Sequence, residues 1–209
     1  GQWQDGPKEK PKGSSHLWGT HIDLGLIVSN DGVHFREPVP DHKVIAHGAE
    51  GEWDSIALLQ GHAFANVGDK TMIWYSHWDT GAQLRNMEIG LATLRRDGFG
   101  FLSRKVPGSP SQFVTAPFEV RRRRAKLLLN VDGVAAANPL TVELLDELDR
   151  PLRGYSGADA ARVVEAGTRR EIEWPKPRSS QLPTSRRLAV RVSFPVGSDA
   201  KVYALYVGA

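Results

Sequence analysis

Short runs of alternating apolar and polar residues occupy the second half of the chain, and turn residues separate them. The turns are marked by Asp132-Gly133 and by Asp149-Arg150-Pro151, and one helical turn is expected within residues 158–164. Strands at spacings of this kind are typical of a β-sandwich or a jelly roll. The pattern predicts strands over residues 126–131, 140–145, 171–174, 188–194 and 202–207.

The first half contains a repeat. Residues 22–35 and 87–101 share an apolar-acid-apolar-glycine start, with Gly25 or Gly90, and each then reaches an Asp-Gly pair and a phenylalanine. Each copy predicts a strand, a type I′ Asp-Gly turn and a return strand. A further hairpin is expected between them, from a strand over residues 56–67 and another over 71–78.

A strand pattern that recurs after 65 residues suggests the blades of a β-propeller. The alternative is a plain antiparallel meander with a coincidental match. Because about four to eight blades are needed for closure, two blades predict the C-terminal part of a longer protein. A start at Gly1 rather than at Met agrees with this. The expected fold is therefore all-β, with about two propeller blades followed by a β-sandwich or jelly-roll domain.

Charge divides the chain. Residues 1–105 contain 11 Lys and Arg against 13 Asp and Glu, whereas residues 106–209 contain 16 against 11. The Pro/Gly/Ser-rich segment 106–111 reads as a connector, so the expected domains are 1–105 and 106–209. All seven His lie in the first 78 residues, which places the candidate ligand-binding chemistry there.

Several classes of function lack their sequence signals. The chain has no Cys, which excludes disulfides and thiolate metal sites. It has no nucleophile elbow, P-loop or dinucleotide fingerprint, and no His-x-x-x-His spacing for a metal. No apolar run approaches about 18 residues, and no secretory leader is visible. We therefore expect no cofactor, no metal and no membrane partner.

Four consecutive arginines occupy residues 121–124. Such a run can bind phosphate groups or a polyanionic glycan, such as a sulfated or uronic polymer. Interleaved aromatic residues are missing, however, and the strand expected from Lys126 follows directly. The run is thus predicted to be a solvated loop, and nucleic acid is not an expected partner.

Three segments carry a family resemblance. Residues 29–35 read SNDGVHF, residues 51–55 read GEWDS, and residues 67–70 read VGDK. The first is similar to the S-x-D-G-x-x-F/W turn of five-bladed propeller glycoside hydrolases, and the others resemble the start of a later blade. The relatives are the family 32 and family 43 like hydrolases, including bacterial members with a β-sandwich after the propeller. The resemblance covers residues 15–105 well and residues 114–207 more loosely.

This resemblance implies hydrolysis of O-glycosyl bonds in a plant or algal polysaccharide, and an extracellular or periplasmic location. Glycoside hydrolysis needs two carboxyl groups about 5–5.5 Å apart for retention or about 6.5–9.5 Å apart for inversion. Such families usually draw three carboxylates from the earlier blades. Those blades are not in this chain, so we expect the isolated chain to be inactive.

The candidate site lies where an innermost strand would begin. Asp54 is the catalytic candidate because the resemblance places it at the mouth of the channel, and Trp53 beside it is a candidate platform for a sugar ring. The alternative is an ordinary turn in which the Asp54 carboxylate accepts hydrogen bonds from backbone N–H groups. His77 and Trp78 end a strand before a Gly loop, which suits a binding rim, although core packing would also explain Trp78.

Alternation along the strand over residues 56–67 adds two candidates. Gln60 and His62 share one face with Phe64 and Asn66, which would point towards a propeller channel. His62 would bind substrate or an axial ion there, or its ring would simply be satisfied by a backbone carbonyl. A rim loop is also expected at His16, Trp18 and His21.

The rival interpretation is a carbohydrate-binding or structural β-module without catalytic activity. A truncated propeller would expose an open sheet edge and self-associate through it, whereas a complete module would be a compact monomer.

Overall fold

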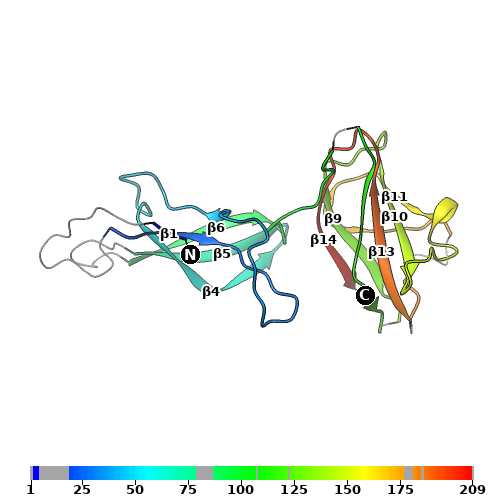
Figure 1. Cartoon of the computed structure of the whole chain (residues 1–209), viewed down its shortest axis with the longest axis horizontal. Helices are drawn as coiled ribbons and strands as arrows, with labels where there is room; N and C mark the ends of the chain where they lie inside the picture. The colour runs from blue at the N-terminus through cyan, green and yellow to red at the C-terminus, as the bar shows by residue number, and fades with distance from the viewer. Residues whose placement is uncertain are drawn as a thin grey trace, which may run out of the picture. The chain divides into compact units, whose positions relative to one another are not determined.

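The structure is a computed structural model that describes residues 2–4, 19–78, 87–106, 108–121, 123–176, 181–184 and 186–208 (Figure 1). The expected all-β class is confirmed, with 49% strand, a sheet that curls into a half-barrel, and no α-helix in the described ranges. The 3₁₀ turn η1 (Gly157–Asp159) is the helical element described. Nowhere in these ranges does a helix reach the length and apolarity that crossing a bilayer requires.

The chain divides into two compact units, unit 1 (Gly1–Leu94) and unit 2 (Arg95–Ala209). This division comes earlier than the boundary expected between residues 105 and 106. Residues 95–105 belong to unit 2 because they bond to it: Arg95 donates to the Asn130 side chain at 2.7 Å, and Leu102 pairs with Val202. The Pro/Gly/Ser-rich segment therefore lies within unit 2.

Unit 1 is built on one six-stranded sheet with the order β1-β2-β4-β5-β6, in which β3 also pairs with β2. The pair β2·β4 is parallel, whereas β4·β5 is antiparallel. As a result the first residues of β2 and β4 and the last residues of β5 lie at the same end of the sheet. We call this end of the strands the site edge. The strands are β1 (Gln2–Gln4), β2 (His21–Gly25), β3 (Lys43–Ile45), β4 (Ala57–Val67), β5 (Lys70–Trp78) and β6 (Met87–Arg95).

The hairpin expected over residues 56–78 is confirmed as β4 and β5. Its register shifts between Gln60 and Phe64, so that β4 contains a bulge. Gly61 makes the bulge possible, since a Cβ there would lie 2.5 Å from the carbonyl oxygen of Trp74. Backbone approach of this kind is a common reason for glycine within a strand.

The two Asp-Gly turns differ from the predicted type I′ hairpins. In the first copy Val28 pairs with Arg36, and the longer loop between them is closed by the Asp31 carboxylate, which accepts the N–H groups of Val33 and His34. In the second copy the chain does not return along β6, because Leu102 pairs with Val202 of unit 2 instead. The prediction of two equivalent hairpins was wrong.

Unit 2 contains two sheets, one with the order β11-β10-β13-β7 and with β8 on β13, and one with the order β12-β9-β14. Both sheets contribute to one large core, which includes Leu129 of β9, Leu144 of β10 and Val190 of β13. The strands are β7 (Ser111–Val114), β8 (Phe118–Glu119), β9 (Lys126–Asp132), β10 (Leu140–Asp146), β11 (Ala161–Val163), β12 (Gly167–Glu171), β13 (Arg187–Phe194) and β14 (Lys201–Gly208).

Four of the five strands predicted for unit 2 are confirmed, as β9, β10, β13 and β14. The prediction of a strand over residues 171–174 is wrong, since β12 ends at Glu171. Its apolar pattern is explained by burial, because Ile172 and Trp174 enter the core beyond the end of the strand. The helical turn expected within 158–164 is present in part as η1, which ends at Asp159 and is followed by β11.

Candidate functional site

Three aromatic rings form a cluster at the site edge of unit 1. Trp53 stacks on Tyr75 with ring centroids 5.8 Å apart and 25° between the planes, and it meets His77 nearly edge-on at 5.9 Å. Tyr75 and His77 lie on one face of β5 because they alternate with Ser76. Trp53 comes from the loop before β4 and remains 44% exposed. The cluster thus presents an accessible indole on a buried aromatic base.

Asp54 joins this cluster through Tyr75. The Tyr75 hydroxyl donates to Asp54 Oδ2 at 2.9 Å. Burial of the phenol, together with this hydrogen bond, raises the pKa of Tyr75 to about 12, so the hydroxyl stays protonated at neutral pH. The half-buried carboxylate is fixed on one side and keeps lone pairs for another donor.

Two glycines permit this close packing. A Cβ at Gly90 of β6 would lie 2.4 Å from Tyr75 Cζ and 2.7 Å from Trp53 Cη2. A Cβ at Gly48 would lie 2.3 Å from Asp54 Oδ1. Real Cβ atoms do not approach other atoms so closely, so both positions require glycine for the rings and the carboxylate to sit where they do.

His77 is a buried imidazole without a described partner. It is 6% exposed, and neither ring nitrogen has a hydrogen bond within the described part of the chain. Leaving a polar group in this state costs free energy, so such groups are rare and point to a missing partner. The ring therefore has hydrogen-bonding capacity available to a ligand that seats on the cluster.

A second polar group lies at the same edge. Asp23 of β2 is 1% exposed; Lys43 Nζ lies 2.5 Å from one carboxylate oxygen, and His47 donates its backbone N–H to the other at 2.9 Å. Burial alone would raise the pKa of Asp23, but the hydrogen bonds from Lys43 and His47 outweigh it and lower the pKa. The ring of His47 also lies 5.2 Å from that of His21.

These partners were not among the predicted site residues. Tyr75 could not be identified from its strand alone because its partner Asp54 comes from the loop before β4. Asp23 could not be assigned because its cationic partner Lys43 comes from β3. The available signal was an acid between two apolar residues of a strand, which indicates a buried carboxylate in need of cations.

Of the other candidates, Gln60 lies directly beside the cluster, and the rest face elsewhere or lie outside the described residues. Gln60 pairs with Tyr75 across the hairpin and is exposed, and His62 is exposed within the bulge. Trp78 is half-buried and alternates with His77, so it faces the other side of the sheet. His16 and Trp18 lie outside the described residues. The assignments of Asp54 to catalysis and of the other residues to substrate binding stay predictions.

The carboxylate nearest to Asp54 in sequence is already engaged. Glu52 Oε2 accepts the backbone N–H of Ala49 at 2.6 Å. Across the described ranges, no three His, Asp or Glu side chains are grouped closely enough to hold a metal ion. What the arrangement offers chemically is an aromatic face, an acceptor at Asp54 and an unpartnered imidazole at His77.

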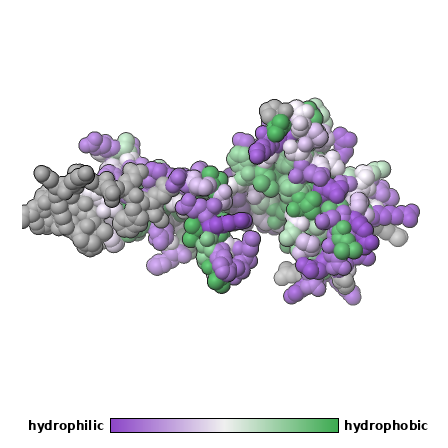
Figure 2. Space-filling model, viewed as in Figure 1, coloured by the Kyte–Doolittle hydropathy of each residue, from purple (hydrophilic) through white to green (hydrophobic). Residues whose placement is uncertain are grey.

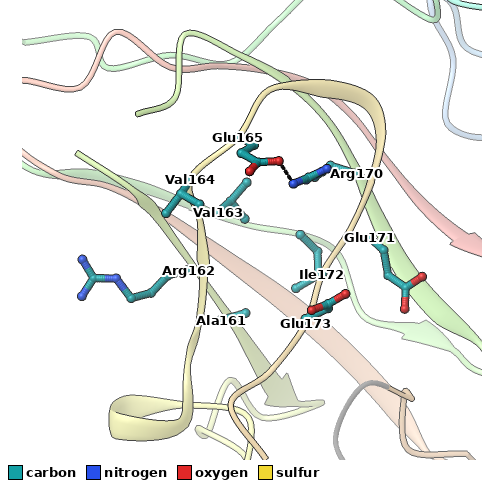
Figure 3. Close-up of a pocket in the computed structure, with 9 residues that line it drawn as sticks. All are labelled: Ala161, Arg162, Val163, Val164, Glu165, Arg170, Glu171, Ile172 and Glu173. Carbon is teal, nitrogen blue, oxygen red and sulfur yellow. Dashed lines mark ion pairs between the residues drawn. The ribbon is translucent and has the colours of Figure 1, made fainter. Parts of the chain in front are cut away.

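Unit 2 contains a separate pocket of about 270 Å³ between β11 and β12 (Figure 3). Its lining is largely charged, and the ion pair between Arg170 and Glu165 lies across its upper part in this view. It includes none of the predicted site residues.

Comparison of the chain with protein-family models, curated proteins and solved structures gives no match.

Proposed function

We propose that this chain is part of a carbohydrate-acting protein and that the cluster of Trp53, Asp54, Tyr75 and His77 contacts the sugar. In the fuller form of the proposal it is the C-terminal portion of a propeller glycoside hydrolase that acts on a polysaccharide or oligosaccharide. Unit 1 would then supply late blades, and unit 2 would be the appended β-sandwich.

The observation that carries this proposal is the exposed indole of Trp53 beside a buried imidazole that has no described partner. Sugar rings present C–H groups on one face and hydroxyl groups around the rim. An indole face suits the first through apolar contact, while a carboxylate and an imidazole suit the second by accepting and donating hydrogen bonds. Both groups adjoin the stacked pair of Trp53 and Tyr75, since Asp54 accepts the Tyr75 hydroxyl and His77 meets Trp53 nearly edge-on.

The presence of two all-β units supports the fuller form. Unit 1 has a small buried cluster of Leu24, Leu58 and Tyr75, and its strands form one continuous sheet in place of separate blades. Two sheets that share one core, as in unit 2, are the arrangement of a sandwich.

The second candidate is a carbohydrate-binding module without catalysis. It is favoured by the engagement of the carboxylate nearest to Asp54 in sequence, because Glu52 accepts the backbone N–H of Ala49. The two candidates share the same sugar contacts and differ in whether a glycosidic bond is broken.

Binding by the isolated chain tests the shared part. Titration with a panel of neutral plant and algal oligosaccharides should reveal a ligand whose affinity falls at least about tenfold in Trp53→Ala and in His77→Ala. The matched control is Trp74→Ala, since Trp74 is similarly exposed, at 40%, and faces the other side of β5. If no oligosaccharide binds, or if the control loses as much affinity as Trp53→Ala, the proposal is wrong. Release of new reducing ends by the complete protein separates hydrolase from binding module.

A further inference from the structure

Five arginines gather at one end of unit 2, and they come from chain segments far apart in sequence. Arg187 at the start of β13 pairs with Glu119 of β8, and the chain continues from Glu119 into the turn that carries the arginine run. The backbone N–H of Leu182 donates to the carbonyl of Ala125 at 2.8 Å, which brings the segment before β13 to the end of the same turn. We call the set the arginine end: Arg121, Arg123, Arg124, Arg186 and Arg187.

The turn that carries three of these arginines is anchored on both sides. Val120 before it and Ala125 after it are each 1% exposed and belong to the core of unit 2. Arg124 reverses the chain with a φ of 63°, after which Lys126 begins β9. The arginine side chains therefore extend from a backbone that the core already fixes. This reduces the entropic cost of ordering the turn when a ligand binds.

Arginines outnumber carboxylates in the two segments that form this surface. All five arginines are exposed, and within the described part of the chain no partner is present for Arg123, Arg124 or Arg186. Among the described residues of these two segments, Glu119 is the one with a carboxylate. Arg121 Nε lies 2.8 Å from its Oε2.

The end of β10 lies beside the start of β13, because Asp146 pairs with Leu188. Asp146 is held by Arg150, and the turn that follows adds the exposed carboxylates of Glu147 and Asp149. In the view of Figure 2, hydrophilic side chains cover much of unit 2 around smaller hydrophobic areas.

The chemistry of these groups selects the ligand. Guanidinium groups bind carboxylate and sulfate oxygens through paired N–H donors, and an extended polyanion engages several of them at once while releasing counterions. Single-stranded nucleic acid would need aromatic side chains for base stacking, and these segments offer none on the surface, since Phe118 packs against the core. We propose that the arginine end of unit 2 is a docking surface for an anionic polysaccharide, one that carries sulfate or carboxylate groups. This surface is separate from the cluster in unit 1 and does not depend on the function proposed for it.

Affinity for a defined polymer tests the proposal. Binding of the full chain to a sulfated polysaccharide, to its desulfated neutral counterpart and to duplex DNA is measured at about 50 and 200 mM salt. We expect the sulfated polymer to bind, the neutral one not to bind, and the affinity to fall steeply as salt rises. The triple variant R123Q/R124Q/R186Q should lose at least about tenfold in affinity at the lower salt concentration.

The matched control is R36Q/R153Q/R162Q, which removes the same charge from exposed positions elsewhere on the chain. It should bind within about twofold of the original chain, and circular dichroism should show both triple variants folded. The proposal is overturned if the sulfated polymer does not bind, if the two triple variants lose affinity equally, or if duplex DNA binds as tightly as the sulfated polymer. Failure of neutral oligosaccharides to bind at Trp53 would leave this result unaffected, so the two proposals fail separately.

Discussion

At the scale of single residues, the two glycines of the sequence repeat have different surroundings. A Cβ at Gly90 would collide with Tyr75 and Trp53, whereas a Cβ at Gly25 would lie 3.8 Å from the nearest atom, the carbonyl oxygen of His42. The repeat therefore places a glycine at both positions, but only one supports the aromatic cluster.

This contrast makes a matched pair of variants. Gly90→Ala should displace the Tyr75 ring, shift the fluorescence of Trp53 and weaken sugar binding at least about tenfold. Gly25→Ala should leave both unchanged, because 3.8 Å is an ordinary van der Waals contact. Fluorescence emission and ligand titration check the pair, and equal behaviour of the two variants would contradict the role assigned to Gly90.

Asp54 is tested by the isosteric change Asp54→Asn, which keeps an oxygen that accepts the Tyr75 hydroxyl. In the complete hydrolase of the proposal, turnover should fall at least about tenfold, equivalent to about 1.4 kcal/mol of transition-state stabilisation. Steady-state kinetics on the cognate polysaccharide measure this. Unchanged kinetics would remove Asp54 from the catalytic site while leaving a sugar contact possible.

Asp23 makes the stability of unit 1 depend on pH. Because its pKa is lowered in the folded state, its contribution is present above the unfolded pKa of about 3.9 and is lost as pH falls through the folded pKa. Urea unfolding between about pH 3 and 6 should show stability decreasing with acid. Asp23→Asn should lower stability at pH 7 and flatten that dependence, and an unchanged slope in the variant would show that other carboxylates cause it.

At the scale of elements, the β4–β5 hairpin shows which local features a strand pattern reveals. Its extent and its turn were predictable because alternation and the Gly68-Asp69-Lys70 sequence define a hairpin directly. The bulge was not, because it depends on Trp74 approaching Gly61 across the ladder. Residues after the bulge meet different partners from those that uninterrupted alternation implies, which explains why His62 did not join the candidate site.

The bulge leads to a stability prediction. Gly61→Val should destabilise unit 1 by about 1–3 kcal/mol, since its Cβ would meet the Trp74 carbonyl at 2.5 Å. Ala63→Val, at an exposed position in the same bulge, is the control and should change stability by less than about 0.5 kcal/mol. Urea midpoints monitored by tryptophan fluorescence give both values, and similar losses in the two variants would argue against a tight approach at Gly61.

At the scale of the whole molecule, unit 1 exposes apolar side chains on one face of its sheet. Ile89 and Leu91 of β6 are 80% and 50% exposed, and they face away from Tyr75 because Gly90 between them lies against that ring. Trp74 of β5 faces the same way, since it alternates with Tyr75. Exposed apolar surface of this kind marks an interaction site or a tendency to aggregate.

We therefore expect the isolated chain to self-associate. Sedimentation velocity between about 1 and 100 μM should show the sedimentation coefficient rising with concentration, and Ile89→Lys with Leu91→Lys should suppress that rise. A chain that stays monomeric over this range would favour the complete, non-catalytic module over the truncated propeller.

The sequence by itself determined the all-β class, the β4–β5 hairpin, four strands of unit 2 and the exposure of the described arginines of the run. These properties follow from side-chain alternation and turn residues, which act over a few neighbouring positions. Trp53, Asp54 and His77 were also identifiable as residue types suited to binding.

Only the tertiary structure decided which of them meet. The parallel pairing of β2 with β4 brings Asp23 to the edge where Trp53, Asp54 and His77 gather, and no local pattern encodes a pairing between strands more than thirty residues apart. The division at Leu94, the passage of residues 95–102 onto β14 and the convergence of Arg187 with the arginine turn have the same origin. Each depends on contacts between segments that are distant in sequence, because burial of a shared core, rather than local conformational preference, sets their position.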